Sequence, residues 1–150
     1  MRILVLVDGS KWSQKAALHA FDVAKRKGGK AKVVLYSVLD RREARAIAFH
    51  LGVRRDSVDE IVKFEERIWE ETKRSVKEVM SVLLRAASEE GINCSMKVVE
   101  GSAVENIVKE ANSGYDLVVM GAMGKSGKGH IGSLLEDVVG SIEPPVMIVR

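Results

Sequence analysis

The sequence predicts an α/β protein in which five parallel strands form a doubly wound sheet with helices on both faces. Short apolar runs rich in β-branched residues alternate with segments of helical periodicity, a pattern typical of βαβ units. Each run is close to the average length of a strand. The length of 150 residues, with 46% hydrophobic and 30% charged content, suits a globular protein with one core. We therefore expect a single domain over residues 1–150.

Five apolar runs are expected to form the strands. They cover residues 3–7, 32–38, 94–99, 117–120 and 146–149. Cys94, at the start of the third run, is the single cysteine and has no second thiol with which to form a disulfide. We expect it to pack as a small apolar residue.

The first helix is expected from about residue 12 to residue 27, with Gly28 and Gly29 as its C-cap. One face of this helix is apolar and is expected to lie on the sheet: Ala16, Ala17, Ala20, Phe21 and Ala24. A short helix is expected within residues 40–56, an arginine-rich segment to which we assign no role.

The remaining helices each begin with a capping box. A long one starts at residues 57–60, carries an apolar stripe that we expect to be core, and ends at Gly91. Another starts at residues 102–105 and stops before Gly114. The last starts at residues 133–136, and two prolines at 144–145 are its expected stop.

Composition and charge exclude several classes of function. No apolar run approaches the roughly 18 residues of a membrane span, and the N-terminus lacks the long apolar region and cleavage site of a signal peptide. The net charge of +3 is spread along the sequence, without a basic block interleaved with aromatic residues. We expect a cytoplasmic protein that binds neither membrane nor nucleic acid.

The segment from residue 117 to residue 133 carries the strongest functional signal. An expected buried strand is followed by a glycine-rich loop with Gly121 and Gly124, and then Gly132 and Ser133 open a helix. Glycines allow close approach of the backbone to a ligand, and the N–H groups of a helix N-terminus attract anions. Phosphate is the natural ligand, and Lys125 adds positive charge. The alternatives are a tight turn and, for Ser133, an ordinary N-cap.

Asp8 directly follows the first expected strand. In an open doubly wound sheet, ligands bind beyond the carboxyl ends of the strands where the winding reverses, here between the first and fourth strands. Asp8 and the loop from Gly121 to Gly124 would then face each other across one cleft. Asp8 could instead cap the first helix or the turn before it.

Several motifs of the sequence occur together: residues 3–10 (ILVLVDGS), 98–107 (VVEGSAVENI) and 116–124 (DLVVMGAMG), followed by Gly132, Ser133 and residues 145–149 (PVMIV). These motifs resemble those of the universal stress protein family, and the resemblance covers nearly the whole sequence except residues 40–56.

The resemblance implies a Rossmann-like sheet with strand order 3-2-1-4-5. As in the ATP-binding branch of the family, it also implies an adenine nucleotide, ATP, ADP or AMP, with Mg²⁺ carried by the phosphates. By position, Asp8, the backbone around Val7, and Val38 would lie at the adenosine. The ribose and phosphates would meet residues of the fourth strand and its loop: Met120, Gly121, Gly124, Lys125, Gly132 and Ser133.

The implied function is a nucleotide-binding module of stress response or signalling. Two departures from the family pattern leave open a nucleotide-free dimeric interaction protein of the same fold. Seven residues separate Gly124 from Gly132, where the family has nine, and Leu135 stands where the family tends to have Ser or Thr. We expect Val at Gly121 or Gly124 to abolish binding and leave the fold nearly intact.

The sequence contains no evident catalytic or metal site. Its histidines are scattered, and no nucleophile lies near a base. We therefore expect a binding protein, with slow ATP hydrolysis at most.

The last strand, residues 146–149, is expected at the edge of the sheet. Its unpaired N–H and C=O groups could pair antiparallel with a second copy, which also resembles how the family associates. We expect Met147→Pro to block pairing on whichever side its N–H faces, and Ile148→Lys to place a charge in the contact.

Overall fold

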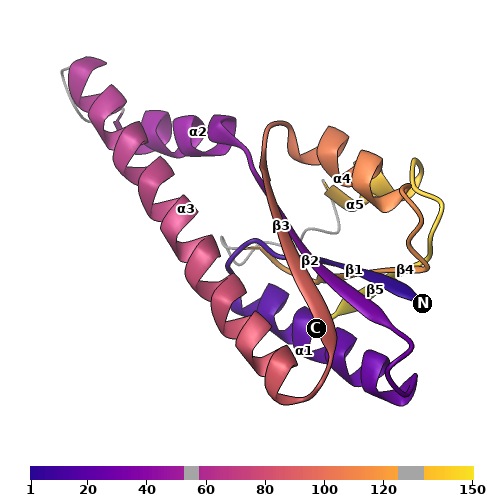
Figure 1. The fold of residues 1–150 in the computed structure, drawn as a ribbon. Helices are drawn as coiled ribbons and strands as arrows, with labels where there is room; N and C mark the ends of the chain where they lie inside the picture. The colour runs from indigo at the N-terminus through magenta and orange to yellow at the C-terminus, as the bar shows by residue number, and fades with distance from the viewer. Residues whose placement is uncertain (53–57, 125–133) are drawn as a thin grey trace.

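The computed structural model describes residues 1–52, 58–124 and 134–150. Its centre is one sheet of five strands in the order β3-β2-β1-β4-β5, and every neighbouring pair is parallel (Figure 1). The strands are β1 Arg2–Leu6, β2 Lys32–Leu39, β3 Asn93–Glu100, β4 Leu117–Gly121 and β5 Val146–Val149. The expected sheet and its strand order are confirmed.

Helices cover both faces of this sheet. They are α1 Lys11–Arg26, α2 Arg41–Gly52, α3 Val58–Glu89, α4 Ala103–Ala111 and α5 Leu134–Val139. α1 and α3 bury their apolar faces in one core, which includes Phe21 and Met80. α4 and α5 contribute to a second core on the opposite face, which includes Leu4 and Ile107. The sheet is therefore doubly wound.

The first helix packs closely on the sheet because its inner face is made largely of small side chains. Ala16, Ala17 and Ala20 are fully buried. At its start, the Oγ of Ser10 accepts the N–H of Ser13 at 3.2 Å. Shortly after its end, the backbone adopts the left-handed conformation at Gly28, with φ of 60°. The expected helix and its glycine stop are confirmed.

The segment from residue 40 onward forms α2, as expected. α2 lies alongside the first half of α3, and both extend beyond the sheet (Figure 1). We call residues 41–52 and 58–69 the α2–α3 arm. On α2, Ala44 and Ala48 are buried, whereas Ile47 and Phe49 are exposed. Close helix packing in the arm therefore involves alanines, whereas Ile47 and Phe49 face outward.

The start of α4 differs from the expected capping box at residues 102–105. Ser102 occupies the N-cap position, but its side chain makes no capping hydrogen bond. The first N–H of the helix, from Ala103, instead donates to Oδ2 of Asp40 at 3.4 Å. The capping box is wrong because a carboxylate from the end of β2 occupies this helix end.

The end of α5 also differs from expectation. The helix stops at Val139, before Gly140, and not at the prolines 144–145. The N–H of Ser141 donates to the carbonyl oxygen of Val138 at 3.0 Å, which closes a turn directly after the helix. Glycine is a poor helix former, so the helix ends earlier than the prolines require.

The edge strand β5 has a defined hydrogen-bonding direction. The carbonyl oxygens of Pro145 and Val149 accept N–H groups from Val118 at 3.0 Å and from Ala122 at 2.8 Å, so both face β4. Because the direction of the backbone groups alternates along a strand, the N–H of Met147 also faces β4. Met147→Pro would therefore damage the sheet itself, and the N–H groups that face outward are those of Val146 and Ile148.

None of the helices among the described residues has both the length and the apolar character needed to cross a bilayer.

Candidate functional site

The candidate site lies at the carboxyl edge of the sheet, where β1, β2 and β4 end side by side. The register of these strands fixes which residues meet there: Leu6 lies opposite Tyr36, and Val5 lies opposite Val119. Two residues further on, Asp8 reaches the level of Val38, and Val7 reaches the level of Gly121. Met120 directly precedes Gly121 in β4. Five of the predicted site residues thus share one edge.

Asp8 is held in a tight turn between β1 and α1. Its Oδ1 accepts the N–H of Ser10 at 2.9 Å, and its own N–H donates to Oγ of Ser13 at 3.4 Å. Gly9 has φ of 85°, a conformation that favours glycine. Ser10, not Asp8, caps the helix, so Asp8 belongs to the turn before the helix. This role is compatible with ligand binding, because a carboxylate has about four acceptor sites.

The two valines of the site face opposite sides of the sheet. Val7 is 3% exposed and belongs to the core beneath α1 and α3, so only its backbone lies toward the edge. Its N–H donates to the carbonyl oxygen of Tyr36 at 2.8 Å. Val38 is half-buried and packs against the core on the α4 side. Of these two valines, only Val38 therefore has a partly exposed side chain at this edge.

Gly121 is constrained by packing against α1. A Cβ atom at this position would lie 2.8 Å from both the carbonyl carbon and the carbonyl oxygen of Trp12. Real Cβ atoms essentially never come so close to a backbone, so a larger residue would push α1 away from β4. The expectation that Gly121→Val leaves the fold nearly intact is wrong, and Gly121 is required by the fold whether or not a ligand binds.

The first residues of the predicted phosphate loop are fixed on the sheet. Met120 is 5% exposed and lies opposite Ile148 of β5. Ala122 donates its N–H to Val149, and both Ala122 and Gly124 are buried. Lys125, Gly132 and Ser133 lie outside the described residues, and so does the side chain of Leu135. The described part of the site is therefore the part predicted for the nucleoside, together with the beginning of the loop.

Trp12 is a neighbour of the site that sequence reasoning missed. The ammonium groups of Lys11 and Lys15 lie 5.0 and 4.9 Å from the centroid of its ring. The signal in the sequence is the i, i+4 spacing of these lysines around an aromatic residue in the first turn of a helix. That turn contains no acidic residue. The start of α1 therefore brings positive charge near Gly121.

Asp40 is a second neighbour that sequence reasoning missed. It follows the last residue of β2, two positions after Val38, and forms an ion pair with Arg42 at 2.9 Å. The side-chain hydrogen bond from Arg42 holds the pKa of the Asp40 carboxyl below its ordinary value, and backbone N–H donors act in the same direction. Asp40 is therefore ionised at neutral pH.

Metal-ligand clusters are absent from the described residues, because no three His, Cys, Asp or Glu side chains gather there.

Comparison with known proteins bears on the whole sequence. The model of the universal stress protein family matches residues 1–150. The chain is 30% identical to Universal stress protein MJ0531 of Methanocaldococcus jannaschii, over 99% of this chain and 81% of that protein. Among solved structures, hypothetical protein MJ0577 is 26% identical with a TM-score of 0.74, over 99% of this chain and 94% of that chain.

Two other structural neighbours carry nucleotides. The universal stress protein from Archaeoglobus fulgidus, in complex with dAMP, is 19% identical with a TM-score of 0.63, over 100% of this chain and 98% of that chain. A family protein from Arabidopsis thaliana with AMP bound is 16% identical with a TM-score of 0.65, over 99% and 90%. Fold, strand order and the full-length family match agree: the chain belongs to the universal stress protein family.

Proposed function

We propose that this protein is an adenine-nucleotide binding module of stress response or signalling, with the nucleotide at the carboxyl edge of β1, β2 and β4. The observation that carries the proposal is the gathering of Asp8, Val38 and Met120 from three neighbouring strands at one edge. The dAMP and AMP complexes of proteins with the same fold support the class of ligand.

The residues at this edge suit a nucleoside. Val38 provides an apolar surface for a base, and Asp8 provides a carboxylate acceptor for its polar groups. Gly121, Gly124, Lys125, Gly132 and Ser133 remain the residues proposed for the phosphates, which would carry Mg²⁺. When bound, the nucleotide supplies phosphate groups that a glycine-rich loop can recognise by their charge.

The test compares two valines that lie opposite each other on neighbouring strands. Val38 and Val99 are register partners, are both half-buried, and pack against the same core. Val38→Gln is expected to weaken ATP, ADP or AMP binding about 10-fold or more, because a contact with the base is lost. Val99→Gln is the matched control, since it changes the same core but lies one strand further from β4.

The measurement is isothermal titration calorimetry with millimolar magnesium present. A wild type that takes up no ATP, ADP or AMP contradicts the proposal, and equal losses in both variants would assign the effect to the core. Mass spectrometry of the denatured, freshly purified protein gives an independent result, because a tightly bound nucleotide co-purifies.

We also propose self-association through β5. The same edge strand is the basis of the alternative function, a nucleotide-free dimeric interaction protein. Within the described part of the chain, β5 pairs only with β4, and its outward backbone groups at Val146 and Ile148 have no partner strand. The side chain of Ile148 is exposed. A second copy related by a two-fold axis could continue the sheet by antiparallel pairing.

A further inference from the structure

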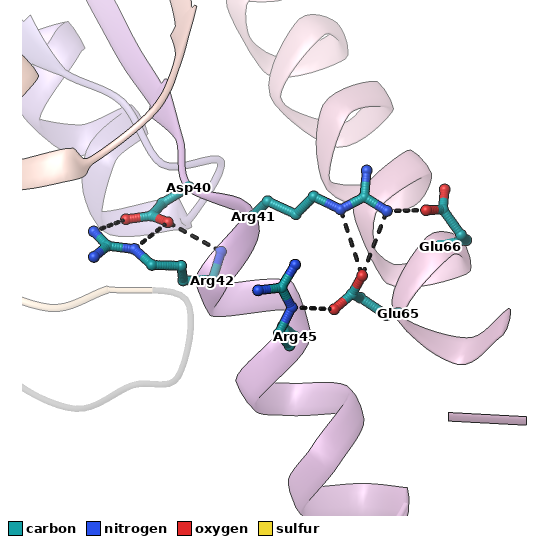
Figure 2. A network of polar contacts seen from close by, with 6 residues as sticks. All are labelled: Asp40, Arg41, Arg42, Arg45, Glu65 and Glu66. Atoms are coloured by element: carbon teal, nitrogen blue, oxygen red, sulfur yellow. Dashed lines mark hydrogen bonds and ion pairs between the residues drawn. The ribbon is translucent and has the colours of Figure 1, made fainter. Parts of the chain in front are cut away.

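A junction of charged residues lies directly beyond the carboxyl end of β2. Asp40 ends the connection from β2, and Arg41, Arg42 and Arg45 lie in the first turns of α2. Figure 2 shows Arg42 folded back onto Asp40, while Arg41 and Arg45 extend toward the glutamates of α3. The junction therefore connects the end of β2 to α2 and, through α2, to α3.

Asp40 binds backbone N–H groups in the first turns of two helices with one carboxylate. Oδ1 accepts the backbone N–H of Arg42 in α2 at 3.0 Å, and Oδ2 accepts the N–H of Ala103 in α4 at 3.4 Å. The guanidinium of Arg42 donates to both oxygens, at 3.1 and 2.9 Å. The Asp40 side chain is only 15% exposed, and these charged and backbone donors bind its carboxylate in place of water.

Arg41 and Arg45 hold the arm in place by contacts with α3. Arg41 pairs with Glu65 at 3.4 Å and with Glu66, and its guanidinium lies 5.5 Å from the centroid of the Trp69 ring. Nε of Arg45 donates to Glu65 at 2.8 Å. Trp69 is buried in the core beneath α3. These contacts concern α2 and α3 and involve no residue of α4.

The Asp40 contact with α4 bears on Val38. Ala103 and Val104, the first residues of α4, pack against the same core as Val38 and Leu6. A second tie holds the approach to α4, because the N–H of Gly101 donates to the carbonyl oxygen of Leu39 at 3.0 Å. The position of α4 over the end of β2 thus depends on hydrogen bonds made within two residues of Val38.

We propose that Asp40 is a positioning residue of the nucleoside end of the site: by binding backbone N–H groups in the first turns of α2 and α4, it sets the start of α4 over Val38. The part that concerns ligand rests on the proposed function. The part that concerns geometry does not, since it follows from the hydrogen bonds of Asp40. Asp40 itself contacts no ligand in this proposal.

Two substitutions at Asp40 separate its geometry from its charge. Asp40→Ala removes both acceptors, and we expect about 10-fold faster exchange of the Ala103 amide and about 10-fold weaker adenine-nucleotide binding. Asp40→Asn keeps one acceptor oxygen and places an NH2 donor where the other oxygen was, so it can hold only one of the two helix N–H groups. We expect its Ala103 exchange and its affinity to lie together between those of Asp40→Ala and the wild type. Nuclear magnetic resonance reports amide exchange and the chemical shifts of the Val38 methyl groups, and calorimetry reports ATP, ADP and AMP affinity.

The matched control is Glu65→Gln. It weakens the ion pairs of Arg41 and Arg45 but leaves the Ala103 contact unchanged, so we expect wild-type exchange of the Ala103 amide and wild-type affinity. A denaturant titration of each variant shows whether an affinity change merely follows global stability. The inference is supported if Asp40→Ala loses affinity, Asp40→Asn loses it in proportion to its faster Ala103 exchange, and Glu65→Gln keeps it, while each variant remains fully folded during the binding measurement.

Two results overturn the inference. Unchanged exchange of the Ala103 amide in Asp40→Ala removes the capping role, and faster exchange with unchanged nucleotide affinity removes the positioning role. If the wild type binds no adenine nucleotide, the proposed function fails by itself. The inference is then decided by the exchange rate of the Ala103 amide and the chemical shifts of the Val38 methyl groups. Both must change in Asp40→Ala and remain unchanged in Glu65→Gln.

Discussion

The two outer strands of the sheet present different edges to solvent. β3 pairs with β2 over eight residues and carries Lys97, whose ammonium group pairs with Glu110 of α4 at 3.1 Å. β5 pairs with β4 over four residues, Val146–Val149, none of which is charged. An unpaired apolar edge invites another strand, whereas charged side chains on an edge discourage one. The comparison indicates that association should use β5 and leave β3 free.

The largest expected effect comes from placing the same charge on each edge. Ile148 on β5 and Met96 on β3 are both exposed apolar residues, at 36% and 45%. Ile148→Lys is expected to weaken dimerisation by at least about 100-fold, because two like charges would meet near the two-fold axis. Met96→Lys is expected to leave dimerisation unchanged. Sedimentation velocity at tens of micromolar measures both.

Either of two outcomes would break the comparison of the edges. A wild type that sediments as a monomer removes dimerisation through β5. Dissociation in the Met96→Lys variant, with an intact Ile148→Lys dimer, would move the interface to β3.

A second prediction concerns the strand that supports β5. Gly121 lies opposite Val149, and its missing side chain allows the close approach of Trp12. Gly121→Val should lower the free energy of unfolding by about 1–3 kcal/mol, because α1 must shift away from β4. Gly140→Val is the control, since a Cβ there meets no atom within 4 Å. Urea titrations followed by circular dichroism compare the two variants, and equal stability losses would contradict the packing explanation.

A third prediction concerns the β3 side of the sheet. Burial raises the pKa of the Cys94 thiol to about 11, from an ordinary value of 9.0. The reactive form is the thiolate, so a rise of about two units reduces its amount roughly 100-fold at neutral pH. Native protein should therefore react slowly with a thiol reagent, and the rate should rise by about that factor in denaturant. Equal rates in both conditions would mean that β3 does not shield the thiol.

Much of the fold follows from patterns that are local in the sequence. The five apolar runs give the strands to within a residue or two, the helical periodicities give the helices but not the end of α5, and the family resemblance gives the strand order. The glycine stop of α1 is also local, since Gly28 and Gly29 directly follow the helix. These features depend on neighbours within one or two turns of helix.

The features that sequence reasoning missed depend on contacts between distant segments. Ser102 has the sequence of a cap, yet Asp40 binds this helix end from 63 residues away. Gly121 has the sequence of a phosphate loop, yet its nearest constraint is the backbone of Trp12. The direction of the Met147 N–H depends on the phase of pairing with β4, which no residue type specifies. The sequence could name candidate residues for the site. It could not show which of those residues also stabilise the fold.

The positions of Trp12 and Trp69 have a spectroscopic consequence. They are the two tryptophans of the sequence, one half-buried against Gly121 and the other buried beneath Arg41. Replacing either by phenylalanine leaves a single tryptophan, whose emission reports on one place in the molecule. The remaining emission of Trp12 follows events near the proposed site, and that of Trp69 follows the seating of the α2–α3 arm. The protein therefore carries two intrinsic optical probes, and changes at the site and in the arm can be timed separately without any added label.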